Sequence, residues 1–328
     1  MCLGAMMFGP RGNPDHDDSI RTIHRALDAG INFVDTSDSY SAGESEQIVG
    51  KALAGRRDDV ILATKFYGPS GDDPNRRGGS RRWVMRAVEE SLRRLGTDWI
   101  DLYQMHRPDF ETDIDETLDA LTDLVQQGKV RYIGGSTFPG SRIVEAQWAA
   151  RERNLQRFVT EQAPYSITVR GIEADVLPTA LRHGMGVLTY SPLSGGWLSG
   201  QWRTELDTPT HSPARQRLAG RFDMSLPINQ RKLEIVTALG DLAAGAGLTL
   251  IDMAIAFALN HPAVTSVIIG PRTAEHLDSQ LPAGDVVLDA DVLDRIDEIV
   301  APGTTINPAD NSFANPALES TARRRTPH

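Results

Sequence analysis

The sequence has almost no cysteine and no long apolar run. Cys2 is the only cysteine among 328 residues, which excludes an intramolecular disulfide framework and fits the reducing environment of the cytoplasm. No apolar run approaches the roughly 20 residues needed to span a bilayer. The N-terminus has neither a basic segment followed by an apolar one nor a cleavage site. We therefore expect a soluble, cytoplasmic protein that does not enter membranes.

Basic residues are also in short supply. The chain has 34 Lys and Arg against 44 Asp and Glu, a formal net charge of −10. We therefore do not expect it to bind nucleic acid or an anionic membrane surface. It can still bind a dinucleotide, because backbone N–H groups and a few basic side chains suffice to hold phosphates. Lysine is especially rare, so a lysine at the end of a buried strand, as predicted for Lys65, requires its own explanation.

The motifs of several enzyme classes are missing. No Gly-x-Gly-x-x-Gly follows a predicted strand, so a Rossmann site is not supported. The eight histidines include neither a His-x-His nor a His-Glu-x-x-His pair, which argues against a barrel metallohydrolase, and we expect no metal site. No serine-centred nucleophile elbow is present. The chemistry must come from another group of residues.

Short apolar segments alternate with amphipathic helical segments along the chain. The predicted strands are continuous apolar runs, which is typical of a parallel sheet covered on both faces. Eight such units in about 300 residues favour a closed (β/α)8 TIM barrel over two doubly wound domains. No linker or composition shift divides the chain, so we predict one domain over 1–328. We expect a flexible loop at 201–227 and an irregular C-terminal tail at 302–328. The predicted strands cover 2–8, 31–34, 60–64, 99–105, 130–133, 158–160, 186–190 and 264–269.

Polar or otherwise unusual residues stand where these strands end. In a (β/α)8 barrel the active site forms at the carboxyl ends of the strands. Any one polar strand end would be weak evidence, but seven in succession predict a site. The strand ends are Asp35, Lys65, His106, Ser136, Gln162, Tyr190 and Gly270-Pro271-Arg272.

Four residues near the first of these ends suit proton donation to a carbonyl. A phenol, with a pKa near ~10, is a poor donor at neutral pH, but a neighbouring ammonium stabilises its phenolate. A buried carboxylate keeps that ammonium charged, and an imidazole can orient a carbonyl oxygen. The hydride must come from a cofactor, because no side chain supplies one. We therefore predict a nicotinamide-dependent reductase of a small-molecule carbonyl substrate. Its catalytic residues would be Asp35, Tyr40, Lys65 and His106.

Each of these residues also has a simpler interpretation. Asp35 could cap the following loop, Tyr40 could be a surface aromatic, and His106 could be an ordinary loop histidine. Lys65 could be the Schiff-base lysine of a barrel aldolase, which also lies at a strand end. Their coincidence on three strand ends makes the simpler interpretations jointly improbable.

A second set of strand ends suits a dinucleotide. Ser136 and Gln162 can hydrogen-bond a carboxamide, and Tyr190 offers a ring for stacking. The segment from Ser191 to Gly196, which includes Leu193 and Gly195, supplies backbone N–H groups for a pyrophosphate. Gly270, Arg272 and Thr273 at a helix start suit a phosphate monoester, which favours NADP over NAD. The loop at 201–227 could fold over the dinucleotide as a lid.

Several stretches resemble the aldo-keto reductases, from about Leu3 to Val300. The resemblance implies a (β/α)8 barrel, use of NADPH, and an Asp-Tyr-Lys-His tetrad at the four residues named above. It also implies that Tyr40 is the general acid and that Tyr190 stacks on the nicotinamide. The stretches are Gly30-Ile31-Asn32-Phe33-Val34-Asp35-Thr36 with Tyr40, Ala63-Thr64-Lys65, Leu95-Gly96-Thr97-Asp98, Asp101 to Asp109, and Tyr190-Ser191-Pro192-Leu193.

The chain departs from the family pattern at three places. The usual Ser-Asn pair after the fifth strand is Ser136-Thr137 here, and His276 and Gln280 replace the frequent Gln and Asn at the adenosine end. The family barrel usually begins with a hairpin that closes its floor, and this hairpin is absent. Either the true start lies upstream or the floor is open, at a cost in stability.

A second hypothesis is a cofactor-binding regulatory subunit that senses redox state with little turnover.

Overall fold

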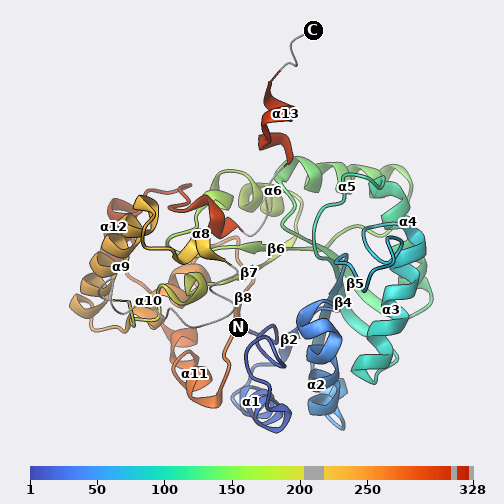
Figure 1. The fold of residues 1–328 in the computed structure, drawn as a ribbon, viewed down its shortest axis with the longest axis horizontal. Helices are drawn as coiled ribbons and strands as arrows, with labels where there is room; N and C mark the ends of the chain where they lie inside the picture. Colours follow the sequence, from blue (N-terminus) through green and yellow to red (C-terminus); the bar gives the residue numbers. More distant parts are fainter. Residues whose placement is uncertain (203–217, 312–315, 325–328) are drawn as a thin grey trace.

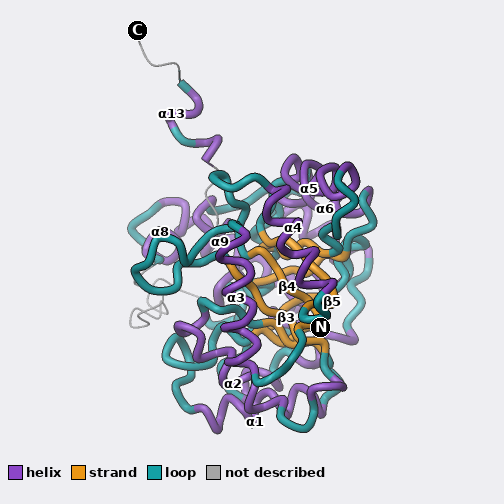
Figure 2. The backbone as a smooth tube through the Cα atoms, turned by 90° about the vertical axis from the view of Figure 1, so that its right-hand side faces the viewer, coloured by secondary structure: helices purple, strands orange, loops and turns teal. Residues whose placement is uncertain are grey.

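The protein folds as a closed barrel of eight parallel strands surrounded by helices (Figures 1 and 2). The computed structural model describes residues 1–202, 218–311 and 316–324. The strands follow one another around the barrel in sequence order, and β8 closes on β1. The predicted (β/α)8 fold is therefore confirmed. The strands are β1 (Cys2–Gly4), β2 (Phe33–Asp35), β3 (Ile61–Phe66), β4 (Ile100–Met105), β5 (Val130–Ser136), β6 (Thr160–Pro164), β7 (Gly186–Tyr190) and β8 (Ser266–Ile269).

Local sequence signals explain where several helices begin and end. Asp15, Thr249 and Asp289 each accept a backbone N–H of the first turn that follows, as expected of N-cap residues. Gly96 ends α3 with a φ of 64°, a left-handed conformation that favours glycine. The helices are α1 (His16–Asp28), α2 (Glu44–Leu53), α3 (Arg81–Leu95), α4 (Ile114–Gln126), α5 (Gly140–Glu152), α6 (Val176–Arg182), α8 (Ala219–Phe222), α9 (Pro227–Gly245), α10 (Leu250–Leu259), α11 (Ala274–Asp278), α12 (Ala290–Ile299) and α13 (Ser320–Arg323).

The first, fifth and sixth strands differ in extent from the prediction. The first predicted strand, 2–8, is wrong beyond Gly4, because the chain turns there and Phe8 donates its N–H to the Ala5 carbonyl. The sixth strand is Thr160–Pro164 rather than 158–160, and β5 continues to Ser136. Polar residues at these two ends therefore belong to the strands themselves.

Only residues 201–202 and 218–227 of the stretch 201–227 belong to the described part of the chain. Residues 203–217 lie outside the described residues, but α8 forms at Ala219–Phe222. The Phe222 ring stacks on Trp197 and Trp202, whose ring centroids lie 4.2 Å apart. Both tryptophans are buried. They therefore pack the loop onto the barrel and do not line an open pocket.

The start of the predicted tail is also packed against the barrel. Asp310 is buried and lies 2.8 Å from Arg221 Nε and 2.5 Å from Lys232 Nζ of α9. Ile306 donates its backbone N–H to Thr168, in the loop after β6. These contacts explain why residues up to 311 follow the body of the protein, whereas α13 stands away from it (Figure 1).

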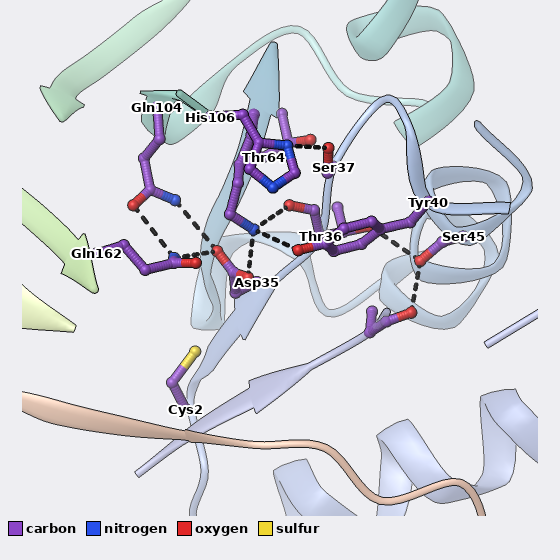
Figure 3. Close-up of polar contacts among 12 residues, drawn as sticks. Cys2, Asp35, Thr36, Ser37, Tyr40, Ser45, Thr64, Gln104, His106 and Gln162 are labelled. Carbon is purple, nitrogen blue, oxygen red and sulfur yellow. Dashed lines mark hydrogen bonds and ion pairs between the residues drawn. The ribbon is translucent and has the colours of Figure 1, made fainter. Parts of the chain in front are cut away.

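An apolar cluster inside the barrel supports the polar residues at its mouth. It consists of buried side chains from β1, β3, β4, β7 and β8. Figure 3 shows one of them, Cys2, below Asp35 of β2. The cluster keeps water out from below, so charges placed above it interact through a medium of low dielectric constant. Its members are Cys2, Ala63, Leu102, Leu188 and Ile268.

No helix among the described residues is by itself long and apolar enough to cross a membrane. Helices α9 and α10 meet the requirement of length and composition only when taken together, across a bend of 93°. Within the same residues, no three His, Cys, Asp or Glu side chains are grouped so that they could hold a metal ion.

Candidate active site

A strained turn directs Tyr40 into the mouth of the barrel. The chain leaves β2 at Asp35 and enters a short turn at Tyr40–Gly43. Ser41, Ala42 and Gly43 have φ values of 49°, 56° and 91°, a left-handed region that costs roughly 1–2 kcal/mol for each residue with a Cβ. A Cβ on Gly43 would come within 2.8 Å of Arg94 Cδ, so only glycine fits there. Such strain is typical of functional sites.

Lys65 connects Asp35 to Tyr40 in the buried layer below this turn. Its Nζ lies 2.5 Å from Asp35 Oδ2, 2.8 Å from the Thr36 carbonyl oxygen and 3.3 Å from Tyr40 Oη. The side chain of Lys65 is fully buried. Burial by itself lowers its pKa, but the charges of Asp35 and Tyr40 outweigh burial and raise the pKa above its ordinary value. Lys65 is therefore an ammonium at neutral pH, held against the phenol.

His106 lies on the other side of the phenol, immediately after β4. The rings of His106 and Tyr40 meet edge to face with centroids 5.7 Å apart. Burial, followed by the charges of Lys65, Arg107 and Arg11, holds the pKa of His106 well below its usual range. The imidazole is therefore neutral at neutral pH and carries one ring proton. The structure thus brings Asp35, Tyr40, Lys65 and His106 together, as predicted.

Two glutamines complete the surroundings of Asp35 (Figure 3). Gln104 Nε2 and Gln162 Nε2 both donate to Asp35 Oδ1, at 3.1 and 2.9 Å, and Gln162 also donates to Gln104 Oε1 at 3.3 Å. We did not predict Gln104 from the sequence. The available signal was its position two residues before His106 in β4, which places both side chains on the same face of the strand. Lys65 of β3 pairs with Gln104 in register.

Ser136 provides an open polar position beside Gln162. The two residues pair in register across β5 and β6. Ser136 Oγ is buried and has no hydrogen-bond partner among residues 1–202, 218–311 and 316–324. Thr137, by contrast, has a φ of 60°, and its hydroxyl donates to the Ser136 carbonyl oxygen at 2.6 Å. Asparagine tolerates this backbone conformation better than a β-branched residue does, so the threonine is the less favourable choice here.

The loop after β7 carries further predicted cofactor residues. Tyr190 ends β7 and is half-buried, whereas Leu193 packs against the barrel core. Ser191 and Gly195 have φ values of 60° and 68°. A Cβ on Gly195 would meet Phe222 at 3.2 Å, so glycine lets the loop run close to that ring.

The remaining predicted residues follow β8 and lie apart from the Asp35 group. Gly270 and Arg272 are exposed, and the Arg272 carbonyl accepts a bond from Asn13 Nδ2 at 2.8 Å. His276 lies on α11, where burial and then the Arg272 charge lower its pKa. Gln280 follows α11 and is buried, and its side-chain amide forms no hydrogen bond with another described residue. No hydrogen bond joins these four residues to Asp35, Tyr40, Lys65 or His106 in the described part of the chain.

The vacant hydrogen-bonding groups fit a nicotinamide dinucleotide. The buried Ser136 hydroxyl lacks a partner, and beside it Gln162 keeps its amide oxygen free of other described residues. At the other end, Arg272 presents an exposed guanidinium next to the start of α11. A carboxamide and phosphates are parts of a nicotinamide dinucleotide, and hydroxyl, amide and guanidinium groups can bind them.

A parallel barrel with titratable side chains at the carboxyl ends of its strands has the architecture of a (β/α)8 enzyme. The sequence model described as "Aldo/keto reductase family" matches residues 1–301. This chain belongs to the aldo-keto reductase family. Membership supports an oxidoreductase activity and a cofactor of the NAD(P)H type.

Individual relatives cover most of the chain. The protein named Uncharacterized oxidoreductase YrpG, from Bacillus subtilis (strain 168), is 40% identical over 310 residues, 91% of each chain. Versiconal hemiacetal acetate reductase from Aspergillus parasiticus is 31% identical over 331 residues, 92% of this chain and 93% of the relative. A probable voltage-gated potassium channel subunit beta from Arabidopsis thaliana is 34% identical over 280 residues, 83% and 84% of the two chains.

Proposed function

We propose that this protein reduces aldehydes or ketones to alcohols with NADPH and that Tyr40 is the general acid. The observation that carries the proposal is the buried contact of Lys65 Nζ with both Asp35 Oδ2 and Tyr40 Oη, at 2.5 and 3.3 Å. An ammonium fixed against a phenol stabilises the phenolate that remains after proton transfer. An ion pair of Asp35 and Lys65 that served only to stabilise the fold would not need the contact with Tyr40 Oη.

Each residue of the site then has one task. Bound NADPH would supply the hydride. Tyr40 donates the proton that the alkoxide oxygen needs, and Lys65 stabilises the phenolate that is left. Asp35 keeps Lys65 in place and charged, while Gln104 and Gln162 saturate the second carboxylate oxygen of Asp35. His106, which is neutral, orients the carbonyl oxygen toward Tyr40.

The cofactor would be held by groups already in position. We propose that Ser136 and Gln162 hold the carboxamide, that Tyr190 stacks on the nicotinamide, and that Arg272 binds the 2′-phosphate. The backbone N–H groups of Ser191, Leu193 and Gly195 would hold the pyrophosphate, and Gly270, His276 and Gln280 would lie around the adenosine. The presence of a single cysteine, Cys2, supports a reducing, cytoplasmic setting for this chemistry.

The direct test is steady-state oxidation of NADPH with a panel of aldehydes and ketones, combined with a separate measurement of NADPH binding by protein fluorescence. We expect turnover that depends on the carbonyl compound. Tight cofactor binding without turnover on any carbonyl would favour the regulatory subunit instead. Borohydride trapping of a substrate on Lys65 would favour an aldolase.

Arg272→Ala is expected to weaken NADPH binding more than NADH binding. A charge-assisted contact with a phosphate contributes roughly 1.5–3 kcal/mol, so the dissociation constant of NADPH should rise about 10- to 100-fold. NADH lacks the 2′-phosphate, and its affinity should change little. Both constants can be measured by fluorescence titration, with Arg231→Ala, an exposed arginine of α9 paired with Glu234, as the control. Equal losses for the two cofactors would refute the phosphate contact.

Gln104→Leu should destabilise the fold through Asp35. The substitution removes a donor from a buried carboxylate oxygen and takes from Gln162 one of its two acceptors, Gln104 Oε1, at a cost of roughly 1–3 kcal/mol. Gln104→Glu should cost more, because it places a second carboxylate beside Asp35. Urea denaturation of the two variants would measure both effects, and a loss that is equal in the two would contradict this explanation.

A further inference from the structure

Two residues of the Tyr40 loop form a hydrogen-bonded chain with His106. The Ser37 hydroxyl lies 3.2 Å from His106 Nδ1 and 3.3 Å from Asp38 Oδ1 (the first contact is drawn in Figure 3). Ser39 is a further partner, with its Oγ 3.0 Å from Ser37 Oγ and its backbone N–H donating to Ser37 Oγ at 3.3 Å. Ser37 is fully buried, and Asp38 is half-buried. His106 Nε2 is left for the mouth of the barrel, because it bonds no other residue in 1–202, 218–311 or 316–324. The proposed function assigns no part to Ser37 or Asp38.

The direction of this chain decides which ring nitrogen of His106 carries the proton. A hydroxyl has a single proton to donate, and when Ser39 donates its own hydroxyl proton to Ser37 Oγ, the Ser37 proton is left for Asp38 or His106. If Ser37 donates it to Asp38, its oxygen accepts a hydrogen bond from a protonated His106 Nδ1, and Nε2 is then a bare acceptor. If Ser37 donates it to Nδ1, the ring proton lies on Nε2. Only the second arrangement offers a donor to a carbonyl oxygen, which is itself an acceptor.

We propose that Ser37 and Asp38 are positioning residues that set the tautomer of His106: ionised Asp38 places the imidazole proton on Nδ1, and protonated Asp38 places it on Nε2. A carboxylate attracts the Ser37 proton strongly, whereas a neutral carboxyl releases it to the imidazole. When Asp38 becomes protonated, it takes one proton from solvent. His106 loses the proton on Nδ1 and gains one on Nε2, so the ring stays neutral. The use of this tautomer for carbonyl binding rests on the proposed function.

The surroundings of Asp38 favour its neutral form near neutrality. Oδ2 of Asp38 is buried and forms no hydrogen bond with any described residue. The same is true of the hydroxyl of Tyr103 from β4. Burial and then Glu46 of α2 raise the pKa of Asp38 to about 7, although Arg94 of α3 and the Ser37 and Ser39 bonds act in the opposite direction. A change of pH across neutrality therefore changes the charge at the end of the chain.

The charges around His106 do not replace Asp38 in this role. They come from Lys65 of β3 and from Arg107 and Arg11 in the loops, and all three lower its pKa. They keep the ring neutral on both sides of neutrality without selecting either nitrogen. His106 is therefore expected to change its tautomer, rather than its charge, as Asp38 titrates.

The experiment is a pH series of two-bond proton–nitrogen NMR spectra of the uniformly ¹⁵N-labelled full chain, in which His106 is assigned by its loss in His106→Asn. In the wild type we expect the protonated nitrogen to change from Nε2 to Nδ1 as the pH rises through about 7. Asp38→Asn and Ser37→Ala should abolish the change. Ser41→Ala, which removes a hydroxyl of the same turn that bonds Phe8, should retain it. A tautomer of His106 that is constant with pH in the wild type would overturn the inference.

A kinetic measurement then links the tautomer to reduction. In the wild type, kcat/KM for the carbonyl substrate should fall about tenfold above the midpoint of the NMR transition, the loss of one hydrogen bond. Asp38→Asn should remove this fall, and an unchanged midpoint in that variant would overturn the inference. The spectra require no turnover. An inactive protein with the tautomer change would refute the reductase and leave the positioning role standing, so the two failures are distinguishable.

Discussion

Tyr40→Phe is expected to abolish carbonyl reduction and to leave NADPH affinity nearly intact. The variant keeps the ring and its edge-to-face contact with His106 but removes the oxygen that lies 3.3 Å from Lys65 Nζ. General acid catalysis contributes typically 10²- to 10⁴-fold, so kcat should fall by at least about 10²-fold. Single-turnover oxidation of NADPH with an active aldehyde measures the loss.

A matched control separates chemistry from folding. Tyr132→Phe removes the same hydroxyl from an exposed tyrosine on β5 and should behave like the wild type. NADPH affinity, measured by fluorescence titration, should change less than about twofold in either variant, because the ring of Tyr40 is retained. Turnover by Tyr40→Phe close to the wild-type value would remove Tyr40 from the role of acid.

The sequence was sufficient to predict the barrel and the residues at its mouth. Continuous apolar strands alternating with helices leave few alternatives to a (β/α)8 barrel, and parallel strands necessarily bring Asp35, Lys65 and His106 to the same end. Tyr40 was harder, because its position depends on the left-handed turn at Ser41 and Ala42. Nothing in the residue types of that turn requires positive φ before Gly43.

Other contacts between side chains could not be predicted from the sequence. Gln104 lies within a strand, not at its end, so its bond to Asp35 follows from the inward face of β4 and the exact register with β3. The chain from His106 to Asp38 depends on the loop conformation at Ser37. The stacking of Phe222 on two buried tryptophans likewise depends on contacts between segments that the sequence pattern does not reveal.

The second large effect is expected for Lys65→Met, a substitution of similar length that removes the charge. The carboxylate of Asp35 would remain in the barrel without its counter-charge. Breaking a buried ion pair from one side typically costs about 3–5 kcal/mol. The surface pair of Lys129 and Glu89 offers a matched control, because Lys129→Met should cost at most about 1 kcal/mol. Urea denaturation, followed by fluorescence, measures both variants.

The double variant Asp35→Asn, Lys65→Met tests the physical cause. Removing both charges takes away the unpaired ion, so the double variant should be more stable than Lys65→Met alone.

The pH dependence of stability gives an independent test of the role of the Lys65 charge. The pKa of Lys65 is raised in the folded state, so its contribution to stability is complete below the unfolded value of roughly 10.4 and declines as the pH rises through the folded value. Lys65→Met should therefore lose this alkaline decline. Lys65→Met and the double variant should both be poor reductases, because Tyr40 then lacks its ammonium. A double variant less stable than both single ones would show that the pair stabilises the fold by contacts other than charge.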